Sequence, residues 1–377
     1  MGQDLVLVLV SCYKSVNNDH ILSGFIHARV KEYQSAGIEV HVFECCPRHW
    51  QPSYIIDGVS VTVGNTRELS AFIDKNEPGA VCPHFISSKM IKGLKKAHFK
   101  PRLFIFVHGI EALHWYQCIF PKTFVSVRRT LAFLKGVIYN VTGMCSIRQF
   151  LRKREHGITL IGVSQWMLDI AVHNYHYPGI KTIMIPNVIR TDIFQFVEKP
   201  ISQRLKVLVL RSFDSNKYAP DIIVKVIKQL SKNPIFEKLE FHIVGEGILW
   251  ERYTSAISDY PNVSIKKGFV SQHKVAELHK EYGIFLCPTR QDAQGVSMCE
   301  AMASGLIPIT LFNTAIPEFV PSVLQCQSVD DLSRLIINIA NDSALFSKLS
   351  ALVSSLITEK CSPEKTTQLE ITLFNQQ

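Results

Sequence analysis

Two carboxylates lie eight positions apart around a glycine in the segment DAQGVSMCE, which runs from Asp292 to Glu300. Residues 283–288 predict a short apolar strand, and residues 295–303 predict a helix that ends at Gly305. A glycine turn before a helix exposes backbone N–H groups to an anion, which the helix dipole also favours. Asp292 could reach ligand hydroxyls, and Glu300 could accept two hydrogen bonds from a vicinal diol. An anion, a diol and sugar hydroxyls together describe a nucleotide sugar. An ordinary strand–helix unit with a capping acid is the alternative interpretation.

The elements around this segment predict two α/β domains with Rossmann-like parallel sheets. In the first half we expect strands at residues 5–10, 39–44, 80–85, 103–107, 160–163 and 182–185, and helices at 21–36, 68–75, 87–97 and 165–174. In the second half we expect strands at 206–210, 239–244, 263–267, 283–288 and 306–311, and helices at 220–230, 249–258 and 295–303. The predicted organisation is an N-terminal domain at 1–196, a polar linker at 197–205, a C-terminal domain at 206–360 and a tail at 361–377 that could pack back on the N-terminal domain. Such sheets bind ligands beyond the C-terminal ends of their strands.

Length and composition agree with two domains of this kind. The chain has 377 residues, of which 47% are hydrophobic. Its ten cysteines show neither C-x-x-C pairs nor metal-ligand spacing, which indicates reduced thiols in a cytoplasmic protein. The apolar stretch at residues 5–10 is too short for a signal peptide and lacks a basic lead. We expect no membrane-spanning helix, which would need about 20 apolar residues.

The positive charge is confined to the N-terminal half of the chain. Residues 1–195 carry 22 lysines and arginines against 13 acids, a difference that equals the whole net charge of +9. No acid occurs between Glu111 and Glu155, where eight bases alternate with large apolar residues. Five of these bases define a candidate membrane patch: Arg128, Arg129, Arg152, Lys153 and Arg154. The pattern favours an anionic membrane surface, although a solvated helix pair fits it equally well. No recognition motif for nucleic acid accompanies the patch.

The segment around Glu300 resembles the family 4 glycosyltransferases, a retaining group with the GT-B fold. Their hallmark is E-G-F-G-L-x-x-x-E-A-M-A-x-G, and here Glu300 is followed by AMASG in the same phase. Asp292 replaces the first Glu of the motif, and Gln294 replaces its Phe. Because Asp is one methylene shorter than Glu, the sugar hydroxyl that it would bind differs from the family's pattern or is held differently.

Weaker landmarks extend the resemblance over nearly the whole chain. Gly24 opens the first helix and would let the backbone approach a donor phosphate, although a glycine at a helix N-terminus explains it equally. His108 begins an H-G pair after a buried strand, where many family members carry one. Gly245 matches the V-G-x-G loop beside the nucleotide, and Val270 matches the G-x-V loop whose backbone reads the base in family members.

Arg211 and Lys217 match in part the family's G-R-L-x-x-x-K-G loop, which grips the donor diphosphate. This chain has Leu210 for the Gly and one extra residue in the loop, and a solvated loop with two bases is the alternative. Two cations would neutralise charge on the leaving oxygen, a role that a metal has in other enzymes. The sequence has no D-x-D pair, and its adjacent acids Asp330 and Asp331 predict the start of a helix. We therefore expect neither a metal nor another cofactor.

The resemblance implies a retaining glycosyltransferase whose C-terminal domain binds a UDP- or GDP-sugar and whose N-terminal domain binds a saccharide acceptor. The reaction would take place in the cleft between the domains. Arg211 and Lys217 would hold the diphosphate, and Glu300 the ribose. His108 would lie near the anomeric centre on the opposite wall, although a buried histidine that only makes structural hydrogen bonds explains it as well.

The transferred sugar would be bound by Asp292 and by the backbone of Gln294, Gly295 and Val296. The acceptor is expected to be linked to polyprenyl diphosphate, as in the synthesis of O-antigen and lipopolysaccharide. The enzyme would then be peripheral on the inner face of the cytoplasmic membrane.

Two other functional classes fit the same fold. A nucleotide-sugar epimerase would need acid and base side chains, for which the sequence offers no matching pattern. The other class is a non-catalytic, membrane-associated binding protein for nucleotide sugars; the presence of Arg211, Lys217 and Glu300 argues against it without excluding it.

Overall fold

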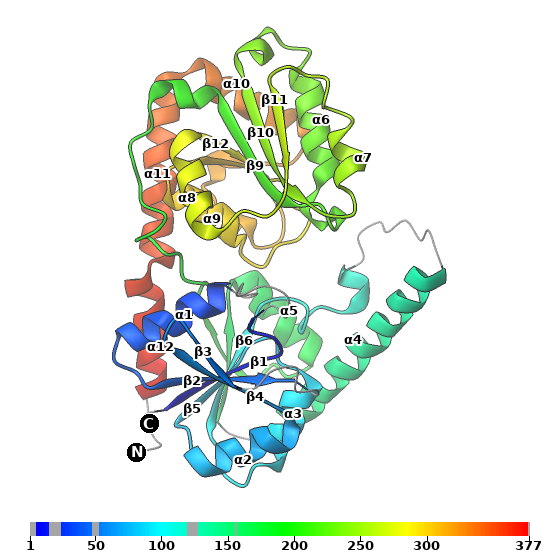
Figure 1. The fold of residues 1–377 in the computed structure, drawn as a ribbon, viewed down its shortest axis with the longest axis vertical. Helices are drawn as coiled ribbons and strands as arrows, with labels where there is room; N and C mark the ends of the chain where they lie inside the picture. Colours follow the sequence, from blue (N-terminus) through cyan, green and yellow to red (C-terminus); the bar gives the residue numbers. More distant parts are fainter. Residues whose placement is uncertain (1–4, 15–23, 47–52, 119–126, 155–156, 376–377) are drawn as a thin grey trace. The chain divides into compact units, whose positions relative to one another are not determined.

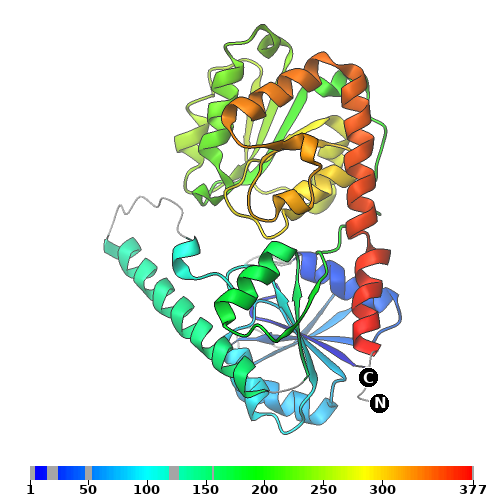
Figure 2. The same ribbon diagram turned by 180° about the vertical axis from the view of Figure 1, so that it is seen from behind.

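Two β-sheets, one in each half of the chain, form the framework of the computed structural model (Figure 1). The structure describes residues 5–14, 24–46, 53–118, 127–154 and 157–375. The N-terminal domain ends at Val188 and also includes the segment from Pro363 onward, and the C-terminal domain comprises Ile189–Ser362. Helices cover both faces of each sheet, so that both domains are doubly wound α/β units (Figures 1 and 2).

The N-terminal sheet has the strand order β3-β4-β2-β1-β5-β6-β7-β8. Its strands are β1 (Val6–Val10), β2 (Val40–Cys45), β3 (Tyr54–Ile56), β4 (Val59–Gly64), β5 (Ala80–Pro83), β6 (Arg102–Val107), β7 (Ile158–Gly162) and β8 (Lys181–Met184). Neighbouring strands are parallel except β3 and β4, which form an antiparallel hairpin. The sequence predicted the other six strands but missed this hairpin.

The helices of the N-terminal domain are α1 (Gly24–Ser35), α2 (Thr66–Asn76), α3 (Ser88–Lys96), α4 (Val127–Lys153), α5 (Gln165–Tyr175) and α12 (Pro363–Asn375). Figure 2 shows α12, at the end of the chain, beside α1 near its start. A buried ion pair joins these helices, because Arg29 Nε lies 2.8 Å from Glu370 Oε1 and both side chains are at most 2% exposed. Tyr33 donates a further hydrogen bond to Glu370. The C-terminal segment is therefore an integral part of the N-terminal domain.

Helix α4 is buried over its C-terminal turns only. Met144, Ile147, Phe150 and Leu151 are buried, and Figure 1 shows the N-terminal turns leaning away from the rest of the domain. The exposed apolar side chains of those turns are Leu131, Leu134, Ile138, Tyr139 and Val141. By length and composition Thr130–Lys153 could cross a membrane, contrary to our expectation, and 11% of its most apolar window is buried. Length and composition do not distinguish a membrane span from a helix that lies on a surface.

The C-terminal sheet is parallel throughout its strand order, β11-β10-β9-β12-β13-β14. Its strands are β9 (Lys206–Ser212), β10 (Glu240–Glu246), β11 (Val263–Lys267), β12 (Ile284–Leu286), β13 (Ile307–Leu311) and β14 (Gln325–Cys326). Its helices are α6 (Pro220–Leu230), α7 (Trp250–Thr254), α8 (Gln272–Glu281), α9 (Val296–Ala303), α10 (Val329–Asn341) and α11 (Ser343–Cys361). The strand order reverses between β9 and β12, and ligands of open α/β sheets bind at such a point.

The segment that we predicted as a linker packs onto the C-terminal domain. It contains a 3₁₀ helix, η3 (Ile201–Leu205), and its Lys199 and Gln203 side chains donate hydrogen bonds to the carbonyl groups of His279 and Lys280. The proline and polar residues indicated a segment without a long helix or strand. They did not reveal that both long side chains find backbone acceptors at the end of α8.

Candidate functional site

The site lies at the carboxyl ends of β9 and β12, where the strand order of the C-terminal sheet reverses. Arg211 is the last residue but one of β9. The loop that follows this strand contains the 3₁₀ helix η4 (Asn216–Tyr218). The loop after β12 leads through Asp292 to Gly295 and into α9. The two loops diverge from neighbouring strands, so the sequence-predicted cations and the acid–glycine turn come to the same edge of the sheet.

Arg211 is a buried cation whose Nε–H group has no hydrogen-bond acceptor among the described residues. Its Nη2 donates to the carbonyl oxygen of Cys287 at 2.8 Å, and its Nη1 lies 3.5 Å from Ser297 Oγ in the first turn of α9. The side chain is 9% exposed, and among the described residues Arg211 Nε has no hydrogen-bond partner. A buried guanidinium N–H without a partner is costly unless another group satisfies it, and an anion at this strand end would be suited to do so.

Tyr218 lies between the two predicted phosphate-binding cations. The Arg211 guanidinium carbon is 5.4 Å from the centre of the Tyr218 ring, and Lys217 Nζ is 5.3 Å from it. Contacts at this distance are cation–π interactions, which order the two long side chains on one aromatic surface. Tyr218 stands where the family's G-R-L-x-x-x-K-G loop has its last glycine, and its ring contacts both cations.

The N-terminus of α9 is open toward the site. Gly295 precedes the helix in the left-handed conformation (φ 78°, ψ 56°), and no side chain caps the helix. The first N–H groups of a helix have no intrahelical acceptor, and they carry the positive end of the dipole. Asp292 Oδ1 accepts the Gly295 N–H at 3.0 Å, so this carboxylate does cap the turn before the helix. The Gln294 side chain is buried, with Nε2 3.8 Å from Cys361 Sγ, and therefore faces the protein interior.

Glu300 lies in the second turn of α9 and accepts a hydrogen bond from Gln272 Nε2 at 3.2 Å. Burial raises the pKa of Glu300 to about 7, an effect that the Gln272 hydrogen bond opposes. The carboxylate therefore lacks the donors that would fully stabilise its charge. Two hydroxyls of a diol would supply such donors and would lower this pKa again.

Gly245 and Val270 are the two remaining residues of the C-terminal domain that the sequence predicted to bind the donor. A Cβ atom on Gly245 would lie 2.0 Å from the Arg211 carbonyl oxygen, so packing between β9 and β10 alone requires a glycine. Val270 lies half-buried in the loop between β11 and α8. Close packing against the Arg211 backbone therefore accounts for Gly245, whether or not the backbone of Gly245 also contacts a nucleotide.

His108 belongs to the N-terminal domain, at the end of β6, and pairs with a histidine that sequence reasoning missed. His108 Nε2 lies 2.8 Å from His84 Nδ1, and His84 stacks on Phe106 with ring centres 4.4 Å apart. Burial lowers the pKa of both imidazoles well below 6.5, as do their neighbouring positive groups. Both rings are therefore neutral at physiological pH. The available signal was the position of His84 directly after the buried strand that ends at Pro83.

The outer nitrogen atoms of this histidine pair, His84 Nε2 and His108 Nδ1, are buried and have no hydrogen-bond partner among the described residues. Two neutral rings that share one hydrogen bond keep one N–H and one lone pair, so the tautomer of His84 sets that of His108. Beside the pair, Glu111 accepts the backbone N–H groups of His108 and Gly109, and burial raises its pKa to about 7. A Cβ atom on Gly24, which begins α1, would meet no atom of the described residues within 4 Å.

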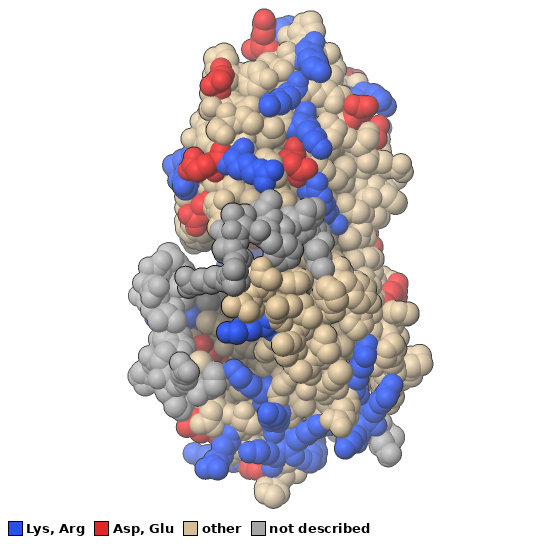
Figure 3. Space-filling view, turned by 90° about the vertical axis from the view of Figure 1, so that its right-hand side faces the viewer, with Lys and Arg blue, Asp and Glu red and all other residues tan. Residues whose placement is uncertain are grey.

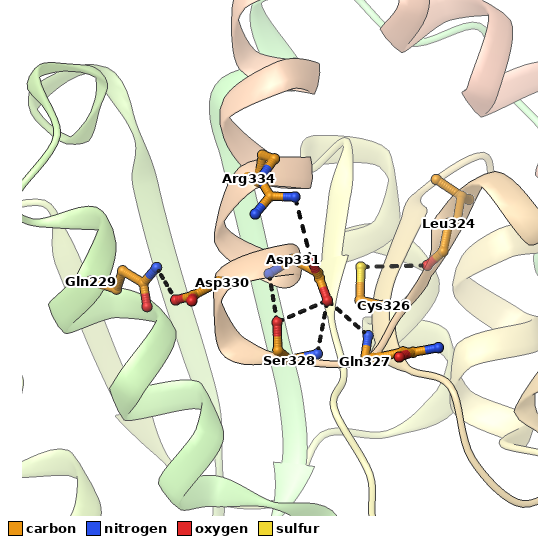
Figure 4. Close-up of polar contacts among 8 residues, drawn as sticks. All are labelled: Gln229, Leu324, Cys326, Gln327, Ser328, Asp330, Asp331 and Arg334. Atoms are coloured by element: carbon orange, nitrogen blue, oxygen red, sulfur yellow. Dashed lines mark hydrogen bonds and ion pairs between the residues drawn. The ribbon is translucent and has the colours of Figure 1, made fainter.

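The adjacent acids that we excluded as metal ligands have structural roles (Figure 4). Asp331 Oδ2 accepts the Ser328 backbone N–H at 3.1 Å and closes a capping box at the start of α10. Asp330 accepts a hydrogen bond from Gln229 at 2.7 Å. Within the part of the chain that the structure describes, no group of three His, Cys, Asp or Glu side chains is arranged to hold a metal ion.

The family comparison covers the domain that carries the site. Residues 204–354 match the family described as Glycosyl transferases group 1. No curated protein sequence matches the chain.

Solved structures match nearly the whole chain. They include sucrose-phosphate synthase from Thermosynechococcus elongatus, with a TM-score of 0.75 at 14% identity over 98% of each chain. A TarM variant from S. aureus in complex with UDP has a TM-score of 0.68 at 12% identity, over 99% of this chain and 100% of that chain. WaaG, a glycosyltransferase involved in lipopolysaccharide biosynthesis, has a TM-score of 0.64 at 12% identity, over 97% and 99%. These likenesses establish the predicted GT-B fold, and the group 1 match supports a glycosyltransferase that takes its sugar from a nucleotide donor.

Proposed function

We propose that the chain is a retaining glycosyltransferase that moves a sugar from a UDP- or GDP-sugar to a saccharide acceptor without a metal ion. The observation that carries this proposal is the convergence of Arg211, Lys217 and the uncapped N-terminus of α9 at the reversal of strand order. Every transfer from a nucleotide sugar releases a nucleoside diphosphate. Two cations and a helix dipole are suited to the charge that develops on this leaving group.

The remaining residues at this edge of the sheet would each bind a different part of the donor. Glu300 would bind the two ribose hydroxyls, which matches its raised pKa and its incomplete set of donors. Asp292 would bind a hydroxyl of the transferred sugar through the oxygen that does not cap Gly295. The backbone of Val296, at the open start of α9, would face the same sugar.

The retaining outcome follows from a displacement on one face of the sugar. The acceptor oxygen bonds to the anomeric carbon as the bond from that carbon to the diphosphate breaks. The departing phosphate oxygen takes the acceptor proton, so the nucleoside diphosphate leaves protonated and no protein base is required. His108, neutral at physiological pH, would orient a hydroxyl rather than transfer a proton.

The experiment that tests this function is a donor panel. The full-length protein is incubated with UDP-, GDP- and dTDP-sugars, with and without excess EDTA, and free nucleoside diphosphate is measured. We expect release from one class of donor, unchanged by EDTA, and a product whose anomeric configuration matches the donor by NMR. Release that depends on added Mg²⁺ or Mn²⁺ would contradict the metal-free mechanism, and an inverted product would contradict the retaining one.

We also propose that the acceptor is a saccharide linked to polyprenyl diphosphate, presented at the inner face of the cytoplasmic membrane. The charge of the N-terminal half and the exposed apolar residues of α4 support membrane association. Figure 3 shows Lys and Arg predominating on the visible face of the N-terminal domain, whereas both signs of charge mix on the C-terminal domain. Since WaaG is involved in lipopolysaccharide biosynthesis, a role in assembling O-antigen or a related polysaccharide is a reasonable expectation for a chain of this fold.

A further inference from the structure

The loop that carries Lys217 is fastened by the turn that follows β12. The backbone N–H of Arg290 donates to the Lys217 carbonyl oxygen at 2.8 Å, and Thr289 Oγ1 donates to the same oxygen at 3.3 Å. Arg290 and Thr289 stand two and three residues before Asp292 in the chain. The turn that leads to the predicted sugar-binding acid is thus bonded to the loop that holds the predicted phosphate-binding lysine.

The Arg290 side chain makes further hydrogen bonds to that loop and to the helix that follows it. Its Nη1 donates to the carbonyl oxygen of Asn216 at 2.8 Å and to Asp221 Oδ1 at 2.8 Å, and its Nη2 donates to Asp221 Oδ2 at 2.8 Å. Asp221 lies in the first turn of α6, directly after the loop. Burial raises the pKa of Asp221, but its hydrogen bonds and charge attraction to Arg290 lower it overall, so both groups remain charged. One guanidinium therefore joins the loop, the start of α6 and its own turn.

The loop needs such a fastening because its backbone is strained. Ala219, two residues after Lys217, is in the left-handed conformation (φ 48°, ψ 47°), which is unfavourable for a non-glycine residue. Ala219 is fully buried, and Pro220 begins α6 immediately after it. Without bonds from outside the loop, rotation at Ala219 would relieve the strain and carry Lys217 to a new position.

We infer that Arg290 is a positioning residue for Lys217: it fixes the loop so that the lysine meets the donor diphosphate, without touching the donor itself. This inference rests on the proposed function. A lysine at position 290 would keep the charge but lacks the planar fork that reaches a carboxylate and a carbonyl oxygen together. The effect should therefore appear in binding of the diphosphate and should operate through Lys217 alone.

A double-mutant cycle tests this coupling. Dissociation constants of UDP and GDP are measured by calorimetry for the wild type, Arg290→Lys, Lys217→Ala and the double variant. We expect Arg290→Lys to weaken binding of the nucleotide that the wild type prefers about tenfold, and to cause no further loss once Lys217 is gone. Binding of the corresponding nucleoside, which has no phosphate, should be unchanged. Arg334→Lys is the matched control, because Arg334 also pairs with an aspartate of this domain, Asp331, but on α10 (Figure 4).

The outcomes separate the inference from the function on which it rests. Additive losses in the cycle, or an Arg290→Lys variant that binds as the wild type does, would overturn the inference and leave the glycosyltransferase proposal intact. A wild-type protein that binds neither nucleotide would overturn both. If Arg290→Lys does not fold, Asp221→Asn completes the same cycle, since it removes the charge from the other end of the fork.

Discussion

Both domains are open, doubly wound α/β units, but the carboxyl ends of their strands present different chemistry. At that edge the C-terminal domain gathers Arg211 and Lys217 beside an uncapped helix. In the N-terminal domain the strand order reverses between β1 and β5, and the ends of β5 and of its neighbour β6 carry His84 and His108, whose buried imidazoles are uncharged. Phe85 lies beside His108, with ring centres 4.7 Å apart. The strand ends thus carry positive charge in one domain and uncharged, aromatic rings in the other.

This contrast shows that the fold determines where a ligand can bind and the side chains determine which ligand it is. A diphosphate needs fixed positive charge, which the C-terminal edge supplies. A sugar ring needs uncharged hydrogen-bonding groups and flat apolar surfaces, and under the proposed function the N-terminal edge would provide them. Point mutations can test this difference, because the charge of each edge depends on few residues.

Removing either cation should have the largest effect. We expect Arg211→Ala or Lys217→Ala to lower sugar transfer about 10²–10³-fold, because each removes a preorganised charge that stabilises the leaving diphosphate. Nucleoside diphosphate release measures the loss. Lys232→Ala, which changes an exposed base of the same domain, is the control and should behave as the wild type. Near-normal transfer in both site variants would show that this edge is not the anion site.

Changing Glu300 to Gln should have the next largest effect, on nucleotide binding. A neutral amide accepts hydrogen bonds from ribose hydroxyls less well, and we expect a loss of roughly 1–3 kcal/mol by calorimetry. Asp292→Asn is the matched control, since it makes the same chemical change eight positions earlier and keeps an oxygen to cap Gly295. It should reduce transfer and spare nucleotide affinity. Unchanged nucleotide affinity in Glu300→Gln would refute the ribose assignment.

The raised pKa of Glu300 gives this prediction a pH dependence. Because that pKa is about 7, the carboxylate becomes protonated as the pH falls through 7 and loses acceptor strength. Wild-type affinity for the nucleotide should therefore fall below pH 7 and level off above it. Glu300→Gln should lack this component, and the difference between the two titrations removes any contribution from the phosphate's own protonation.

The histidine pair tests the neutral half of the comparison. His84→Phe keeps an aromatic ring against Phe106 but leaves His108 Nε2 without its partner. We expect the transfer rate to fall roughly fivefold, because the activation free energy rises by about 1 kcal/mol, while nucleotide affinity stays unchanged. Since burial lowers both pKa values, the transfer rate should show no imidazole titration above about pH 6.5. Equal losses in transfer and in nucleotide affinity would contradict the division between the domains.

The sequence predicted most of the sheet framework, because parallel strands buried on both faces appear as short continuous apolar runs. It missed the hairpin of β3 and β4, and it predicted helix 249–258 where α7 covers only Trp250–Thr254. The acid–glycine turn and both cations reached one edge of the sheet because strand ends meet there in any such fold. Their local patterns sufficed to find them.

The supporting contacts could not be predicted in the same way. Arg290 reads as an exposed base in a turn, and its role depends on Asp221, which is 69 residues away. His84 pairs with a residue 24 positions later, and Arg29 pairs with one 341 positions later. Such pairs depend on the packing of separate elements, and local periodicity carries no information about them.

The structure changes the membership of the candidate membrane patch that the sequence predicted. Arg154 donates a hydrogen bond to the Pro101 carbonyl oxygen and is only half-exposed, so its position serves the domain itself. Arg152 and Lys153 are exposed at the end of α4. Arg128 and Arg129 lie in its first turn, but their side chains fall outside the described part of the structure.

The last and smallest effect per residue concerns membrane binding, which should belong to the N-terminal half with its net charge of +9. Changing Arg128, Arg129, Arg152 and Lys153 to Ser should weaken binding of the full-length protein to anionic vesicles by about 1 kcal/mol for each base, in low salt more than in high. Changing Leu131, Leu134 and Ile138 to Ser should remove the part of the binding that salt does not screen. Co-sedimentation at two salt concentrations separates the two parts, and donor hydrolysis should be intact in both variants. Vesicle binding as strong as that of the wild type in both variants would mean that α4 is a solvated helix, and access to a lipid-linked acceptor would have to use another surface.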